Sequence, residues 1–300
     1  MSDGMNYIPK HLQIEPTNGI CSSRCTMCTF EDWTRKPHTM TNETFKRILE
    51  KFKPYTQAIN YLTLHGCGEP LMDRQLIAKV ALAKEMGFNG IGFATNCTHL
   101  NASTAKGLIK AGLDTVLCSI DGTRKETHEA IRVGTSFESV VNNVKDFIKI
   151  RNESGHTKVI VRFIRQELNK AEWPEFYEYW SAQVNPDFGD FVTKFDVHNW
   201  GSALEDYKGK DVNDELSIEK LVCQDLFERL WIFSDGHLGF CTADDNGFFD
   251  FGSVLEQDPI EMYNNETFNH YRQMMEKGCI AELEHCNNCT IPRSRALKET

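Results

Sequence analysis

The stretch CSSRCTMC, residues 21–28, places Cys21, Cys25 and Cys28 on one short loop. Three thiolates that converge from a tight loop suit a cubane iron–sulfur cluster, and they leave one iron of a four-iron cluster without a protein ligand. An iron with an open position can bind a further molecule. The loop therefore predicts a reactive metal centre near the start of the chain.

A zinc site is the main alternative, because Cys-x-x-Cys pairs often hold structural zinc with four protein ligands. Here the local set stops at three cysteines. No histidine lies in the right place to complete it, since His38 is ten residues past Cys28. The loop by itself favours iron–sulfur over zinc.

Composition limits the class of protein further. The 300-residue chain has a formal net charge of −10 and no run of lysine or arginine, so we expect no nucleic-acid partner. No apolar run approaches the roughly 18–20 residues of a membrane span, and the N-terminus lacks a signal-peptide pattern. We expect a cytoplasmic protein without a membrane partner. Its eleven cysteines then indicate metal binding or redox chemistry rather than disulfides.

Between His11 and His198, six β-rich runs alternate with helical stretches, a pattern that builds parallel sheets through right-handed crossovers. The runs cover residues 12–16, 61–66, 88–95, 115–121, 159–165 and 194–198. Thr41 or Asn42 could cap the first helix, and Asn101 or Ser103 the third. The pattern predicts an α/β fold, barrel-like or doubly wound, with functional residues at the carboxyl ends of the strands.

Several polar or glycine-rich positions follow these strands. The segment GCGEP, residues 66–70, comes directly after the second run, and its two glycines let the backbone approach a ligand closely. Asn96 and Cys97 end the third run. Ser119 and Asp121 end the fourth and share one face of the strand, so we expect both to look into the barrel mouth.

The C-terminal part has a different character. Residues 201–222 are polar and charged and predict a linker. After it, the pattern C-x12-G-x4-C from Cys223 to Cys241 and the pair Cys286 and Cys289 predict a small metal-stapled module over residues 223–300. Cys279 is a possible substitute ligand, and zinc remains an alternative for this site.

The cysteine loop and GCGEP together resemble the radical S-adenosylmethionine (radical SAM) superfamily over about residues 11–200. The resemblance implies a partial (β/α)6 TIM-like barrel in which Cys21, Cys25 and Cys28 hold a 4Fe–4S cluster that binds S-adenosylmethionine. This chain departs from the family at Cys67 and Cys97, where glycine is usual. The implied contacts to S-adenosylmethionine are Met27, Gly66, Cys67, Gly68, Glu69, Asn96, Ser119, Asp121, Arg162 and His198.

The C-terminal cysteines resemble the SPASM domain in its shortened twitch form. This implies one auxiliary 4Fe–4S cluster, held by Cys223, Cys241, Cys286 and Cys289. A chain of this size with one auxiliary cluster is similar to the aminocyclitol dehydrogenases and carbohydrate epimerases of the same subgroup.

That similarity implies a 5′-deoxyadenosyl radical that takes hydrogen from a sugar-like or aminocyclitol substrate, followed by oxidation with the auxiliary cluster as electron acceptor. We expect a small-molecule substrate and a reductant such as flavodoxin or ferredoxin. Asp244 or Asp245 could act as the base. A radical epimerase that uses Cys97 as hydrogen donor, a peptide- or protein-modifying enzyme, and a non-catalytic zinc-binding protein remain alternatives.

Overall fold

The computed structural model describes residues 6–201, 203–204 and 222–292. Its centre is one eight-stranded sheet in which all neighbours are parallel except the last pair. In spatial order the strands are β10 (Phe191–Asp196), β9 (Lys158–Arg165), β7 (Thr115–Ser119), β6 (Ile91–Thr95), β5 (Tyr61–Thr63), β1 (His11–Ile14), β11 (Arg229–Ile232) and β12 (Leu238–Gly239). The six strands predicted from the sequence are all present, and successive ones lie side by side.

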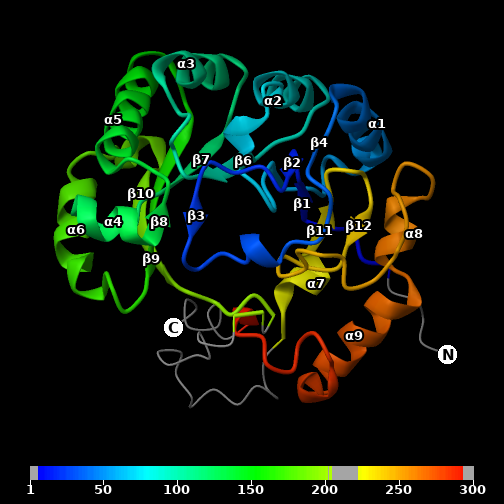
Figure 1. Ribbon diagram of the computed structural model, residues 1–300. Helices are drawn as coiled ribbons and strands as arrows, with labels where there is room; N and C mark the ends of the chain where they lie inside the picture. The colour runs from blue at the N-terminus through cyan, green and yellow to red at the C-terminus, as the bar shows by residue number, and fades with distance from the viewer. Residues whose placement is uncertain (1–5, 202, 205–221, 293–300) are drawn as a thin grey trace.

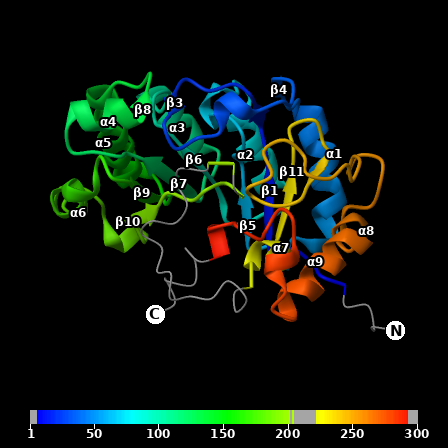
Figure 2. The same ribbon diagram turned by 60° about the horizontal axis from the view of Figure 1, so that its bottom comes forward.

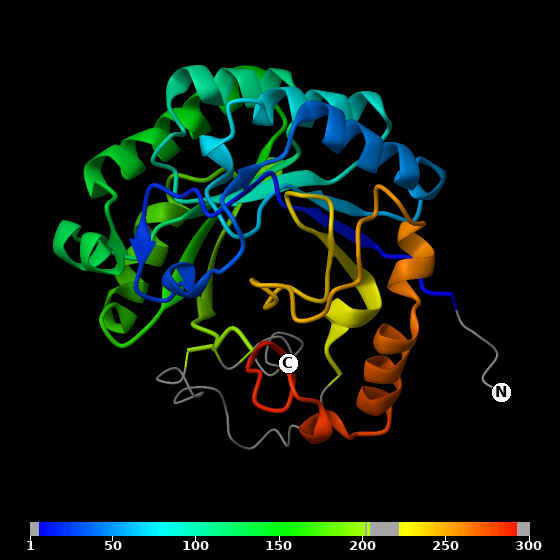
Figure 3. The same cartoon turned by 45° about the vertical axis from the view of Figure 1, so that its right-hand side comes forward.

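Helices cover one side of this sheet. The α-helices are α1 (Asn42–Phe52), α2 (Leu76–Glu85), α3 (Ala102–Lys110), α4 (Lys125–Ile131), α5 (Phe137–Ser154), α6 (Trp173–Ser181), α7 (Gln224–Glu228), α8 (Pro259–Tyr263) and α9 (Glu266–Glu276). Short 3-10 helices span Phe30–Asp32, Lys53–Tyr55, Pro70–Met72, Lys170–Glu172, Pro186–Phe188 and Ile280–Glu282. From α1 to α6 the helices form an arc outside the curved sheet (Figures 1 and 3). This is the predicted partial barrel.

Local sequence explains where these helices begin. The side chain of Thr41 accepts a hydrogen bond from the Thr44 amide and so caps α1. Asn101 caps α3 through the Thr104 amide in the same way. In α1 the buried residues follow the predicted three- and four-residue spacing; they are Phe45, Ile48, Leu49 and Phe52.

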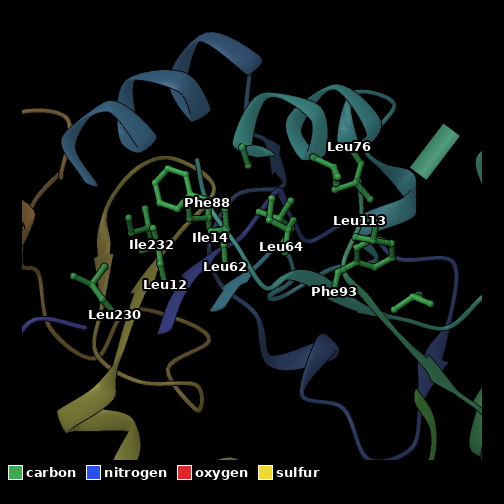
Figure 4. Close-up of a cluster of buried hydrophobic side chains, with 14 of the residues drawn as sticks. Leu12, Ile14, Leu62, Leu64, Leu76, Phe88, Phe93, Leu113, Leu230 and Ile232 are labelled. Carbon is green, nitrogen blue, oxygen red and sulfur yellow. The ribbon is translucent and has the colours of Figure 1, made fainter. Parts of the chain in front are cut away.

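The main hydrophobic core lies between the sheet and the helical arc (Figure 4). Alternate residues of the strands point into it, such as Leu12 and Ile14 of β1 and Leu230 and Ile232 of β11. The opposite side chains of the same strands therefore face the concave side of the barrel, where polar residues can gather.

The C-terminal segment takes part in the same sheet. Strand β11 pairs in parallel with β1, and His11 lies opposite Arg229. One continuous core also contains residues from both parts of the chain. The predicted linker, residues 201–222, lies largely outside the described residues.

Two short ladders stand outside the main sheet. They pair β2 (Thr17–Asn18) with β4 (His38–Thr39), and β3 (Arg24–Cys25) with β8 (Arg132–Val133). Figure 2 shows β3 and β8 next to each other, in the loops at one end of the sheet. The second ladder fixes the N-terminal cysteine loop over the barrel mouth.

Two global properties complete the description. No helix among the described residues has the length and apolar character that crossing a bilayer requires. All eleven cysteines lie within the described residues, and none of them forms a disulfide.

Candidate active site

A cavity of about 400 Å³ lies on the concave side of the sheet. Its wall includes the three N-terminal cysteines and many of the predicted contact residues; these are Cys21, Cys25, Cys28, Met27, Gly66, Cys67, Gly68, Glu69, Asn96, Ser119, Arg162 and His198. Residues of the C-terminal part, such as Trp231, Thr242 and Ile291, complete the wall. The cavity is thus shared by both parts of the chain.

The N-terminal cysteine loop is held in a tight turn, since the Cys28 amide donates to the Cys25 carbonyl at 3.0 Å. Ser23 Oγ lies 3.5 Å from Cys21 Sγ and 3.4 Å from Cys25 Sγ, which brings these two sulfurs to one side of the loop. Burial, together with the neighbouring Cys25, raises the pKa of Cys28 to about 12. A cationic metal centre would favour the thiolate form of such a buried thiol.

The GCGEP segment packs tightly against the strand before the cysteine loop. A Cβ atom at Gly66 would lie 2.7 Å from Glu15 Cγ, and one at Gly68 would lie 2.6 Å from the Thr17 carbonyl. The Cys67 amide donates to Glu15 Oε1 at 2.8 Å. Both glycines are therefore required by a close approach within the chain itself.

Glu69 and Asn96 are fixed next to each other below the cysteine loop. Glu69 accepts hydrogen bonds from Thr95 Oγ1 at 2.6 Å and from the Asn96 amide at 2.8 Å. Asn96 Nδ2 donates to the hydroxyls of Ser22 and Ser23 at 3.1 and 3.3 Å. Burial raises the pKa of Glu69. Both residues lie where the sequence placed them, at strand ends that face the cavity.

Ser119 and Asp121 do not share the role expected of them. Ser119 lines the cavity and accepts a hydrogen bond from Arg162 Nη2 at 2.7 Å. Asp121 is fully buried and is not part of the cavity wall; it accepts from the Ile164 amide at 2.6 Å and pairs with Arg132. Strand β7 ends at Ser119, so the alternation that put both side chains on one face does not extend to Asp121. We therefore revise the expectation that Asp121 contacts S-adenosylmethionine.

Cys97 is also turned away from the cavity. Its side chain is fully buried in the main core, and its backbone has a φ of 63°, in the left-handed region that favours glycine. Burial together with Cys118 raises the pKa of Cys97 well above its ordinary value. The positive φ explains why glycine is usual at this position in the family. The Cys97 thiol itself does not reach the cavity.

Asp244 and Asp245, the two predicted bases, lie away from the cavity wall. Asp244 is fully buried and accepts hydrogen bonds from the amides of Phe240, Gly247 and Phe248 at 2.7–2.8 Å. Its carboxylate thus shapes the turn after Cys241. Asp245 is also buried and does not belong to the cavity wall, while its carbonyl accepts from Arg35 Nε at 2.8 Å. Neither carboxylate reaches the cavity.

The C-terminal cysteines form a second, smaller site. A cavity of about 20 Å³ is lined by all four predicted ligands, Cys223, Cys241, Cys286 and Cys289. Burial, followed by the charges of Asp244 and the other three cysteines, raises the pKa of Cys241 well above its ordinary value. Cys279 does not line this cavity. The four cysteines found from sequence spacing are therefore the set that converges.

Both sites fit iron–sulfur clusters in the identity and number of their donors. Three cysteines face the large cavity and four face the small one, as expected for an open and a closed cluster. Within the described residues, no three side chains of Cys, His, Asp or Glu are grouped to hold a single metal ion.

Sequence reasoning missed several residues that join the two parts of the chain. Arg35 forms hydrogen bonds from Nη1 and Nη2 to the buried carboxylate of Glu15, each 2.9 Å long. Glu15 also accepts from the amides of Cys67 and Ser234. No local pattern marks this pair, because its partners come from distant segments.

Arg132 and the polar wall of the cavity were missed as well. Arg132 follows α4 and was not distinguished from surface arginines, although it is 6% exposed. Gln13, His65 and Arg229 line the cavity from β1, the end of β5 and β11. The alternation of polar and apolar residues in β1 could have indicated Gln13; Arg229 required knowledge that β11 joins this sheet.

Comparison with protein families supports both sites. The model of the radical SAM superfamily matches residues 16–179, and the SPASM model of iron–sulfur cluster-binding domains matches residues 223–290.

Curated relatives share only part of their length with this chain. A probable GTP 3′,8-cyclase of Saccharolobus islandicus (strain M.14.25 / Kamchatka #1) is 26% identical over 159 residues, which are 53% of this chain and 49% of that protein. Another, from Saccharolobus solfataricus, is 23% identical over 224 residues, or 72% of this chain and 68% of that protein. The chain thus spans about half the length of the first relatives it matches.

Solved structures with the same fold cover nearly the whole chain. BtrN in complex with AdoMet and 2-DOIA has a TM-score of 0.64 at 17% identity and covers 95% of this chain and 94% of its own. Streptococcus suis SuiB bound to S-adenosylmethionine has a TM-score of 0.68 at 14% identity, with coverage of 96% and 72%. At these identities the similarity establishes the fold.

Proposed function

Because this chain belongs to the radical SAM superfamily and carries a SPASM domain, we propose that it oxidises a small sugar-like or aminocyclitol molecule. Radical SAM enzymes with this domain use S-adenosylmethionine, a cluster that binds it and an auxiliary cluster. When bound, these groups supply a 5′-deoxyadenosyl radical that removes hydrogen from the substrate. The finer assignment of substrate and reaction is our proposal.

The position of the cavity carries this proposal. The cavity is walled by the cysteine loop and by residues of the C-terminal part such as Trp231 and Thr242, so a small molecule held there lies next to the cysteine loop. BtrN, which shares the fold, is described in complex with AdoMet and 2-DOIA, which also supports a small-molecule substrate.

The wall of the cavity is suited to hydroxyl groups. Gln13 Nε2 donates to the His65 carbonyl at 3.1 Å, and Gln13 Oε1 accepts from Arg229 Nη1 at 2.7 Å, so these three residues form an ordered polar surface. Such a surface can position a polyhydroxylated ring with its target C–H bond toward the cysteine loop.

His65 lines the cavity wall, whereas Asp244 and Asp245, the bases expected from the sequence, do not. Burial, together with the charges of Arg229 and Arg162, lowers the pKa of His65 to about 3, so the imidazole is neutral near pH 7. A neutral ring can accept a hydrogen bond from a substrate hydroxyl.

Epimerisation remains a second candidate because a thiol outside the cysteine loop, that of Cys67, also lines the cavity. Cys67 is buried beside Trp231 and Phe233, and burial together with the charge of Glu15 raises its pKa well above its ordinary value. A thiol that stays protonated can return a hydrogen atom to a substrate radical. Cys67 therefore replaces Cys97 as the donor expected for that reaction.

Mass spectrometry in deuterated buffer separates the reactions. Reconstituted enzyme would be incubated with S-adenosylmethionine, dithionite and a panel of aminocyclitols and sugars. Oxidation predicts a product that has lost two hydrogen atoms, whereas epimerisation predicts a product that has gained one solvent deuterium. Deoxyadenosine formation that responds to peptides and to none of the ring compounds would contradict the proposal.

A further inference from the structure

The side chain of Arg132 connects one cysteine of the N-terminal loop to a buried carboxylate. Arg132 Nη1 donates to Cys25 Sγ at 3.6 Å, and Arg132 Nε lies 2.7 Å from Asp121 Oδ2. The backbones of Cys25 and Arg132 also face each other across the β3–β8 ladder. Side chain and backbone together hold the guanidinium against this sulfur.

Burial makes this arrangement electrostatically strong. Arg132 is 6% exposed and Asp121 is fully buried, so water screens their charges only weakly. Arginine is effectively always protonated in proteins, and the ion pair with Asp121 keeps this buried charge partnered. A permanent positive charge therefore lies beside Cys25.

Asp121 is itself fixed from two further directions. Its Oδ1 accepts from the Ile164 amide at 2.6 Å, and its own amide donates to His128 Nδ1 at 3.2 Å. The carboxylate cannot turn toward the cavity without losing the hydrogen bond from the Ile164 amide. It is placed to orient Arg132 and to offset part of its charge.

The neighbouring cysteine has a different environment. Cys21 Sγ lies 3.5 Å from the Ser23 hydroxyl and accepts from Asn96 Nδ2 at 3.9 Å, and both of these groups are neutral. Cys25 combines the same Ser23 contact with a cationic donor. Of these two cysteines, Cys25 is therefore the one that has Arg132 as a cationic donor.

We propose that Arg132, oriented by Asp121, sets the reduction potential of the cluster held by the N-terminal loop. Adding an electron to a cluster increases the negative charge on its sulfur ligands, and hydrogen bonds and positive charge at these sulfurs stabilise the reduced state. Arg132 raises the potential, and Asp121 limits that rise. The inference depends on cluster binding by this loop and not on the identity of the substrate.

Redox titration followed by electron paramagnetic resonance tests this directly. The holoenzyme would be compared with Arg132→Gln, Arg132→Lys and Asp121→Asn. At a fixed solution potential we expect Arg132→Gln to lower the reduced-to-oxidised ratio of the first cluster about tenfold, or ~59 mV for one electron. Asp121→Asn should shift the ratio in the opposite direction, because it leaves the Arg132 charge without its counter-ion. Arg132→Lys should fall between wild type and Arg132→Gln.

Two controls make the result specific. The second cluster in the same molecule serves as an internal reference and should keep its potential in every variant. Arg151→Gln breaks another buried ion pair, Arg151 with Asp190, away from the cysteine loop, and should leave both potentials unchanged. Iron and sulfide content would be measured for each sample.

Several outcomes would overturn the proposal. These are an unchanged potential in Arg132→Gln at full iron content, shifts of the same sign in Arg132→Gln and Asp121→Asn, or equal shifts of both clusters. Should Arg132→Gln fail to take up iron, the signs of Arg132→Lys and Asp121→Asn decide the question. Product formation is not used, so failure of the substrate proposal leaves this test intact.

Discussion

The two cysteine sites of this molecule are built in opposite ways. The first takes three cysteines from one loop and faces a cavity of about 400 Å³. The second takes four cysteines from three separated segments and encloses only about 20 Å³. The first is thus by far the larger cavity of the two.

The side chains around the two sites also differ, in their polarity. Ser23, Asn96 and Arg132 offer polar or charged groups to the sulfurs of the first site. Apolar side chains such as Phe240 and Met275 help to line the second. This contrast is consistent with the proposed oxidation, in which the first site binds and reacts and the second accepts an electron.

The largest effect should come from removing a cysteine of the first site. Cys28→Ala is expected to reduce deoxyadenosine formation to background, because the loop then has too few ligands for its cluster. Iron content should fall by about half, since one of two four-iron clusters is lost. Chromatography and iron analysis measure both. Cys279→Ala, outside both cavities, is the matched control and should retain full activity.

Removing the buried Arg35–Glu15 ion pair, whose other partners lie in the C-terminal part, should have the next largest effect. Arg35→Met leaves the Glu15 carboxylate buried without its cation, and such a change typically costs about 3–5 kcal/mol of unfolding free energy. Denaturant unfolding of the reconstituted protein measures this. Lys46→Met, which removes half of an exposed pair with Glu50, should change stability by only about 0–1 kcal/mol. Equal losses in both variants would show that the buried Arg35–Glu15 pair contributes no more to stability than an exposed pair.

Removal of a second-site cysteine should separate the two functions. Cys241→Ala is expected to leave deoxyadenosine formation within about twofold of wild type while product per deoxyadenosine falls on the order of tenfold. The reason is that, in the proposed oxidation, hydrogen is removed at the first site and the substrate radical passes its electron to the second. Parallel quantification of both compounds tests this. Loss of deoxyadenosine formation with intact first-site iron would contradict the division of labour.

The smallest effect concerns the pH dependence of the unfolding free energy, through His128 near the first site. Burial, followed by the charge of Arg132, lowers the pKa of the buried His128 to about 3, below its unfolded value of about 6.5. The unfolded chain therefore binds the extra proton first, and stability falls as pH drops below about 6.5, with a slope of up to ~1.4 kcal/mol per pH unit. In His128→Asn this contribution should disappear, although Asn can still accept from the Asp121 amide. Urea unfolding at pH 7 and pH 5.5 gives the slopes, and identical slopes would refute the assignment.

Much of the fold follows from local sequence. Six strands lie where the alternation of β-rich and helical runs predicts them, and Thr41 and Asn101 cap helices as their side chains allow. These features depend on neighbours a few residues apart. The same holds for the cysteine loop, whose three cysteines are close in sequence and line one cavity.

Side-chain direction at the strand ends was less predictable. Ser119 faces the cavity but Asp121 does not, and Cys97 points into the core. Beyond the last paired residue the backbone no longer alternates regularly, so the destination of each side chain depends on distant partners such as Arg132. The Asp244 carboxylate likewise accepts hydrogen bonds from amides of its own turn and does not line the cavity.

The sequence by itself determined the family, the partial barrel and the two sets of cysteines, because motif spacing and the alternation of β-rich and helical runs can be recognised along the chain without knowing which segments pack together. Only the tertiary structure decided which side chains surround them. Strand β11 joins β1 from 218 residues away, with Arg229 opposite His11, and Arg35 meets both Glu15 and the Asp245 carbonyl. Such contacts form when distant segments are packed together, and no local pattern of residues encodes them.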